Sequence, residues 1–88
     1  MTGDYIEEFN QVMMILKVIN DDNTVPRNIR KAASDAIKEL SKKADSSGIR
    51  ASNVISILDI ISQDQNCPGN ARVQIWNAVS VLESIHDE

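Results

Sequence analysis

The sequence predicts an all-α protein, a four-helix bundle built from two related helix–turn–helix hairpins. The chain repeats itself at a constant offset of 42 residues, because residues 12–40 and 54–82 share ten of 29 positions. Apolar residues recur at helical spacing in both copies, and no useful stretch shows the period of two that marks a strand. The length fits one helical domain that spans residues 1–88.

The first helix is predicted over about residues 4–20. Asp4 and Glu7 have the spacing of a capping box at its start. Its apolar arc is broader than the usual stripe of about 100°. The arc consists of Tyr5, Ile6, Phe9, Val12, Met13, Leu16 and Ile19, widened by Ile15 and Val18. Because a broad arc contacts more than one neighbour, we expect this helix and its repeat at the centre, with the other two outside.

The second helix is predicted over about residues 26–43. Pro26 suits the first turn, where a missing N–H costs nothing. Asp22 or Thr24 is the expected source of capping oxygens. The inward stripe is narrow and contains alanines, which allow a partner helix to approach closely. It consists of Ile29, Ala33, Ala36, Ile37 and Leu40.

The second hairpin repeats this plan, with helices over about residues 48–63 and 68–86. Ser47 is the expected N-cap of the third helix, and Pro68 begins the fourth. The inward residues of the third helix are Val54, Leu58 and Ile61, flanked by Ile57 and Ile60, and those of the fourth are Ile75, Ala78, Val79, Leu82 and Ile85.

Each copy places an aspartate four residues before its proline and an arginine four residues after it. The two sets are Asp22, Pro26 and Arg30, and Asp64, Pro68 and Arg72. A functional interpretation makes them a pair of charged sites for a ligand. A structural interpretation has each aspartate cap the following helix, where a carboxylate favours the helix dipole, or pair with its arginine.

Three stretches carry a resemblance to a known family. They read DxNTVPRNIRxAA from residue 21, ISILDxIS from residue 55 and IWNxVSxLE from residue 75. The chain resembles, over about residues 9–83, an archaeal family catalogued only as uncharacterised protein family 0147. That resemblance implies a small four-helix bundle and brings no assigned activity or catalytic residue. The hairpin is also similar, more weakly, to HEAT-type repeats, which leaves an open stack of hairpins as the alternative to a closed bundle.

Composition favours a cytoplasmic protein without a membrane segment. The net charge is −4, and Cys67 is the single cysteine, so an intrachain disulfide cannot form. A reducing compartment is the natural setting. The N-terminal stretch lacks the basic and apolar regions of a signal peptide, and the longest apolar run, residues 12–16, is far shorter than the roughly 20 residues of a membrane span.

Residues able to support catalysis or bind a metal are few. His86 is the single histidine and is more typical of a chain end than of a ligand. Cys67 stands where the first copy has Val25, which favours a small buried side chain over a reactive thiol. Asp21 and Asp22 are adjacent, but the spacing of a calcium-binding loop is absent. A glycine-rich phosphate loop is also absent. We expect no enzyme, metal or cofactor.

A basic stripe follows the second helix. It consists of Arg27, Lys31, Lys38 and Lys42, which lie within about 60° of one another on a helical wheel. Residues 26–44 hold six basic and two acidic side chains. Such a stripe can lie along phosphates. The alternative is a solvated face with Asp35 and Glu39 as partners.

The fourth helix is more apolar than the second. Val73 replaces Lys31, and Trp76 replaces Ser34. Trp76 either covers a groove in the core or belongs to an interface, where tryptophan often dominates the binding energy. We therefore expect a non-enzymatic interaction or scaffold module that binds a protein partner, with a homodimer through the fourth helix as the simplest form. The alternative is a nucleic-acid or ribonucleoprotein accessory protein that uses the basic stripe.

Overall fold

The computed structural model describes residues 5–87. It contains four α-helices and, within those residues, no strand: α1 (Ile6–Asp21), α2 (Arg27–Leu40), α3 (Ser47–Ser62) and α4 (Gly69–Leu82). The predicted all-α fold is confirmed. Asp4, half of the expected capping box, lies outside the described residues.

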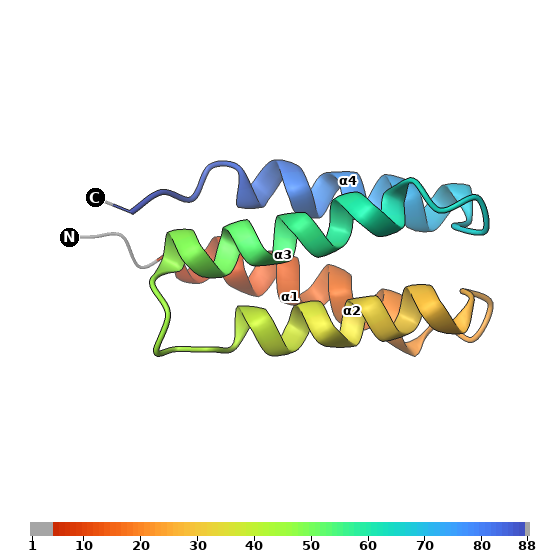
Figure 1. Cartoon of the computed structure of the whole chain (residues 1–88), viewed down its shortest axis with the longest axis horizontal. Helices are drawn as coiled ribbons and strands as arrows, with labels where there is room; N and C mark the ends of the chain where they lie inside the picture. Colours follow the sequence, from red (N-terminus) through yellow and green to blue (C-terminus); the bar gives the residue numbers. More distant parts are fainter. Residues whose placement is uncertain (1–4, 88) are drawn as a thin grey trace.

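Consecutive helices run antiparallel, up and down along one long axis (Figure 1). The loop between α1 and α2 and the loop between α3 and α4 lie at the same end of the bundle. The start of α1, the end of α4 and the α2–α3 link lie at the other end. Short connections between antiparallel neighbours produce this arrangement.

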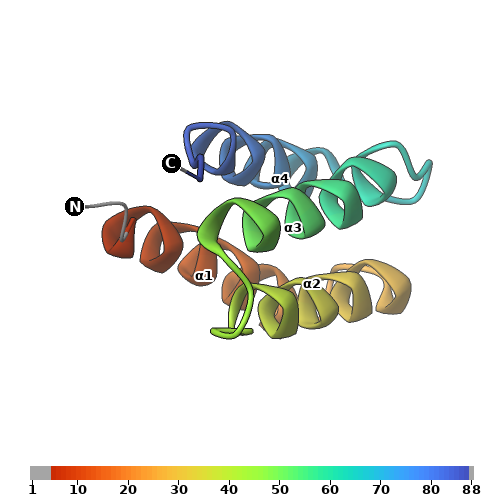
Figure 2. The same ribbon diagram turned by 60° about the vertical axis from the view of Figure 1, so that its left-hand side comes forward.

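The four helices form a closed ring, in which each helix packs against two neighbours (Figure 2). Helix α1 packs against α2 and α4, and α3 packs against the same two, whereas the backbones of α1 and α3 do not approach each other closely. The prediction that α1 and α3 occupy the centre is therefore wrong. The broad apolar arc of each of these helices packs against two neighbouring helices, and neither helix is surrounded by the other three. The contact between α1 and α4 closes the ring and excludes the open stack of hairpins.

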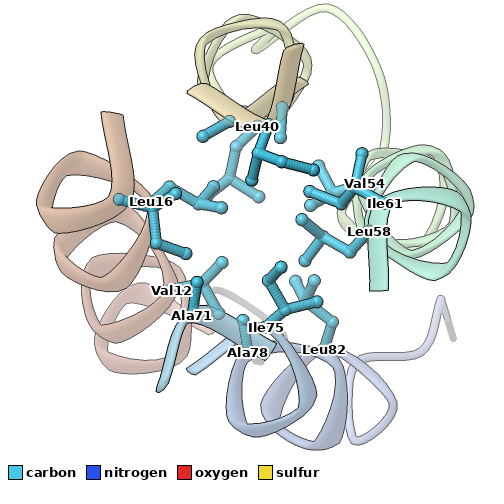
Figure 3. Close-up of a cluster of buried hydrophobic side chains, with 14 of the residues drawn as sticks. Val12, Leu16, Leu40, Val54, Leu58, Ile61, Ala71, Ile75, Ala78 and Leu82 are labelled. Carbon is cyan, nitrogen blue, oxygen red and sulfur yellow. The ribbon is translucent and has the colours of Figure 1, made fainter. Parts of the chain in front are cut away.

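The core occupies the axis of the ring, where side chains from all four helices converge (Figure 3). The largest fully buried side chains come from all four helices and include Leu16 of α1, Ile29 of α2, Leu58 of α3, and Ile75 and Leu82 of α4. Helices α2 and α4 contribute buried alanines beside larger residues. Each fully buried leucine or isoleucine stabilises the fold by about 1.5–3 kcal/mol.

Some residues of the predicted arcs lie outside the core. Ile6 and Val18 of α1 and Ile60 of α3 are more than half exposed. The ring explains this difference, since a helix with two neighbours leaves its outer side in solvent. The apolar arcs predicted from sequence periodicity are therefore wider than the surface that the neighbouring helices cover.

The ends of the helices differ from the prediction in three places. Helix α2 ends at Leu40 and α4 at Leu82, so each is shorter than expected at its C-terminus. After α4 the chain makes one short turn, in which the Ile85 backbone N–H donates to the Leu82 carbonyl, and buries Ile85 in the core. The N-cap of α3 is Ser46 rather than Ser47, because the Ser46 Oγ accepts the Ile49 backbone N–H at 3.2 Å. None of the helices in the described residues is long and apolar enough to cross a membrane.

Candidate interaction surfaces

The two repeated aspartates close their own loops. The Asp22 Oδ1 accepts hydrogen bonds from the Thr24 backbone N–H at 2.9 Å and from the Thr24 hydroxyl at 2.6 Å. The Asp64 Oδ1 accepts the Asn66 backbone N–H at 2.8 Å. The bonds from Thr24 lower the pKa of Asp22. Neither α2 nor α4 has a side-chain cap, so the prediction that Asp22 or Thr24 caps α2 is wrong.

The two repeated arginines bind backbone carbonyl oxygens. The Arg30 Nε donates to the Val25 carbonyl at 3.0 Å. The Arg72 Nε donates to the Ser62 carbonyl at 2.8 Å, and its Nη2 donates to the Asp64 carbonyl at 3.1 Å. These bonds satisfy carbonyl groups at helix ends and in loops, which lack helical partners. The repeated charges thus form contacts inside the hairpins, but among residues 5–87 neither aspartate caps the following helix or forms an ion pair with its arginine.

The two hairpin loops are joined to each other. The Asn28 Nδ2 donates to the Asp64 Oδ2 at 2.9 Å, and this bond links the start of α2 to the α3–α4 loop. Val25 and Cys67 occupy equivalent buried places beneath the two loops. The descent of the hairpins from one duplicated unit stays a prediction from the sequence.

Cys67 and His86 have the environments of structural residues. Cys67 is only 4% exposed, and burial raises the pKa of its thiol, although Arg72 opposes this shift. A buried thiol with a raised pKa is a poor nucleophile. His86 is exposed beyond the end of α4, and its backbone N–H donates to the Tyr5 hydroxyl at 3.3 Å. Within residues 5–87 no group of three or more His, Cys, Asp or Glu could hold a metal ion.

The basic stripe on α2 is partly neutralised. The Lys31 Nζ lies 3.2 Å from the Asp35 Oδ2. Lys42 lies beyond the end of α2, with its Nζ 2.7 Å from the Glu39 Oε2. That pairing raises the pKa of Lys42 and lowers the pKa of Glu39. The stripe is shorter and less positive than the helical wheel suggested.

The outer face of α4 is exposed and apolar at its centre. Val73 and Trp76 lie one turn apart and are 54% and 55% exposed. Trp76 is therefore no core residue. Arg72 is the single charged residue of α4, and its guanidinium donates to backbone carbonyl groups. Helix α2 has six charged residues over the same length.

Comparison with known proteins identifies a family. The chain matches the uncharacterised protein family UPF0147 over residues 1–85. It belongs to this family. A UPF0147 protein of Metallosphaera sedula is 49% identical over 80 residues, covering 91% of this chain and 90% of the relative. A UPF0147 protein of Methanothermobacter thermautotrophicus is 51% identical over 81 residues, covering 92% and 79%.

Two crystal structures share the UPF0147 bundle. A UPF0147 protein from Thermoplasma acidophilum superposes with a TM-score of 0.86 at 36% identity, covering 91% of this chain and 94% of that one. A protein of unknown function superposes with a TM-score of 0.91 at 37% identity, covering 99% of both chains. The resemblance stated from sequence motifs is confirmed. None of these names carries an activity.

Sequence reasoning missed a cluster at the far end of this UPF0147 bundle. The Asp87 carboxylate accepts the Ser46 hydroxyl at 2.7 Å and the Gly48 backbone N–H at 2.8 Å. The Arg50 guanidinium lies 4.5 Å from the centre of the Phe9 ring, and its Nη1 donates to the Leu40 carbonyl at 3.0 Å. These residues are distant in sequence, so no local spacing reveals them. The cluster joins α1, α2, α3 and the C-terminal tail.

Proposed function

We propose that this protein is a small non-catalytic interaction module that self-associates through the outer face of α4. The observation that carries the proposal is the exposed indole of Trp76 on a helix face whose one charged residue is engaged elsewhere. A cytoplasmic setting, expected from the single cysteine, belongs to the same proposal.

The composition of the α4 face suits the centre of an interface. Such centres are depleted of charged residues and enriched in aromatic side chains. Tryptophan and its immediate neighbours often contribute most of the binding energy. Val73 adds apolar area one turn from Trp76. Polar exposed residues, among them Asn77 and Ser80, border the pair and supply a hydrophilic rim.

A second copy is the simplest partner for this face. A two-fold dimer requires one patch that is complementary to itself. A helix face with few charges reduces the repulsion that two chains of net charge −4 otherwise experience. Self-association therefore needs no further component.

The basic stripe supports a nucleic-acid role less well. Lys31 and Lys42 already have carboxylate partners, and a phosphate must compete with these. The side chains of Arg27 and Lys38 make no hydrogen bond or ion pair within residues 5–87. Two cations on one helix offer little of the multiple phosphate contact on which such binding depends.

Light scattering over a dilution series tests the proposal. We expect a wild-type mass of twice 9.8 kDa at micromolar concentration. Trp76→Ala and Val73→Lys should each give the monomer mass while the helical circular dichroism signal stays unchanged. Lys31→Ala, at the position equivalent to Val73, is the matched control and should leave the mass unchanged. A wild-type protein that remains monomeric throughout the series contradicts self-association.

A further inference from the structure

Trp76 lies on the side of α4 that is nearer α3. Arg72 and Trp76 are four residues apart and share one side of the helix. The Arg72 guanidinium reaches the Ser62 carbonyl at the end of α3. Trp76 therefore borders the outer surface that α3 and α4 form together.

Helix α3 presents an even, weakly polar stripe to the same surface. Its exposed members, spaced by four, three and four residues, are Ser52, Ser56, Asp59 and Gln63. The Asn53 Nδ2 donates to the Glu39 Oε1 on α2 at 3.2 Å, which places the other side of α3 toward α2. The Ser56 hydroxyl donates to the Ser52 carbonyl at 3.2 Å. Because its own helix satisfies this hydroxyl, covering it costs little hydrogen bonding with water.

Helix α4 presents a stripe with the same spacing, and the two stripes together define the α3–α4 face. The residues of this face are Ser52, Ser56, Asp59, Gln63, Gly69, Val73, Trp76 and Ser80, all exposed and only one of them charged. The residues 42 positions earlier define the opposite, α1–α2 face. They are Asn10, Met14, Lys17, Asp21, Arg27, Lys31, Ser34 and Lys38, of which five are charged. The low charge is thus a property of both helices of the second hairpin.

The size of the bundle determines how much of its surface a partner must cover to form a stable interface. The principal extents are 40 Å by 19 Å, so one whole side of the bundle projects to about 760 Å² per copy before the relief of its side chains is counted. A stable interface of standard size takes about 800 Å² from each partner. A partner seated on α4 alone covers about half the width of the side and falls well short. We therefore expect a dimer interface of standard size to include α3 as well as α4.

We propose that a second copy of this chain covers the whole α3–α4 face by two-fold symmetry. The Trp76 indole of each copy then lies over the small serine side chains of α3 in the other copy. The face carries both parts of such a contact, the exposed indole of Trp76 and the small exposed side chains of Ser52 and Ser56, as a two-fold contact requires. This inference rests on the proposed self-association and names the surface that it uses.

Charge substitution on α3 tests the inference. Ser56→Arg and Ser52→Arg each place a cation on the α3 stripe in both copies. Each should raise the dimer dissociation constant at least about tenfold, because a long charged side chain then occupies the place of a small serine beneath the indole of the other copy and is desolvated there. Arginine favours an exposed helix at least as well as serine does, so the monomer should stay folded by circular dichroism. Met14→Arg, at the equivalent exposed position on α1, is the matched control and should leave the constant unchanged.

The outcomes separate this inference from the proposed function. A wild-type dimer that Trp76→Ala dissociates, but that both serine variants leave intact, overturns the role of α3 and preserves the role of α4. A monomeric wild type overturns self-association itself. Dissociation by Met14→Arg overturns the assignment to the α3–α4 face. A wild-type mass that keeps growing beyond the dimer with concentration overturns the two-fold arrangement.

Discussion

Asp87 caps α3 from the opposite end of the chain: its carboxylate accepts the backbone N–H of Gly48 at 2.8 Å. The same carboxylate accepts the hydroxyl of Ser46, the N-cap residue. The first N–H groups of a helix lack partners within it, and a negative charge there interacts favourably with the helix dipole. The C-terminal tail therefore completes the capping of a helix that begins about forty residues earlier.

This contact predicts a specific dependence of stability on pH. The hydrogen bonds from Ser46 and Gly48 lower the pKa of Asp87 in the folded state. A group whose folded pKa is lowered stabilises the fold above its unfolded pKa, and the contribution is lost as pH falls through the folded value. We expect Asp87→Asn to reduce the thermal midpoint at pH 7. The difference from wild type should shrink below about pH 4. A difference that stays constant between pH 7 and pH 3 contradicts the role of the carboxylate charge.

Gly48 provides a second test of the same contact. A Cβ on Gly48 would lie 2.6 Å from the Asp87 Oδ2, so Gly48→Ala must displace the carboxylate. We expect faster hydrogen exchange at the first amides of α3, even though alanine is the better helix former.

Gly69→Ala is the matched control for Gly48→Ala. A Cβ there meets no heavy atom within 4 Å. It should stabilise the protein by about 0.4–1 kcal/mol, through the lower entropy of the unfolded chain. Equal hydrogen-exchange rates at the first amides of α3 in both variants would show that Asp87 does not stabilise the start of α3.

Truncation of one buried leucine in either hairpin should strongly destabilise the fold. Leu16 and Leu58 are fully buried at the axis of the ring. Leu16→Ala and Leu58→Ala should each reduce the free energy of unfolding by about 2–5 kcal/mol, since a cavity remains. Urea denaturation measures this change. Lys17→Ala, at an exposed neighbour, should fall within about 0.5 kcal/mol of wild type. A comparable loss in the free energy of unfolding for Lys17→Ala would contradict the assignment of the buried face of α1.

Substitution by lysine should reduce stability by different amounts at the two hairpin arginines, Arg30 and Arg72. Arg72 binds two carbonyl groups through two nitrogen atoms, whereas Arg30 has one such bond. A lysine cannot reproduce the paired geometry. We expect Arg72→Lys to destabilise by about 1–2 kcal/mol, and more than Arg30→Lys, in urea denaturation. Arg27→Lys, on the exposed stripe, is the control and should be nearly neutral. Equal losses for Arg72→Lys and Arg30→Lys would contradict the carbonyl-binding role.

The sequence by itself determined the four helices and the composition of the core. Apolar residues at helical spacing, such as Val12 and Leu16 in α1, predicted which side of each helix is buried. Pro26 and Pro68 marked the starts of α2 and α4 to within one residue. These features could be predicted because helical periodicity and turn chemistry depend on neighbours in the chain. Motifs in the same stretches identified the family.

Only the tertiary structure decided which helices touch and which side chains stay in solvent. The ring separates α1 from α3 and leaves Val18 and Ile60 outside, although their spacing matches that of core residues. Likewise, the exposure of Trp76 depends on where α3 lies beside α4. Asp87 meets Gly48 only because the tail after α4 reaches the start of α3. Each of these contacts joins residues far apart in the chain, and no local pattern encodes the packing that brings them together.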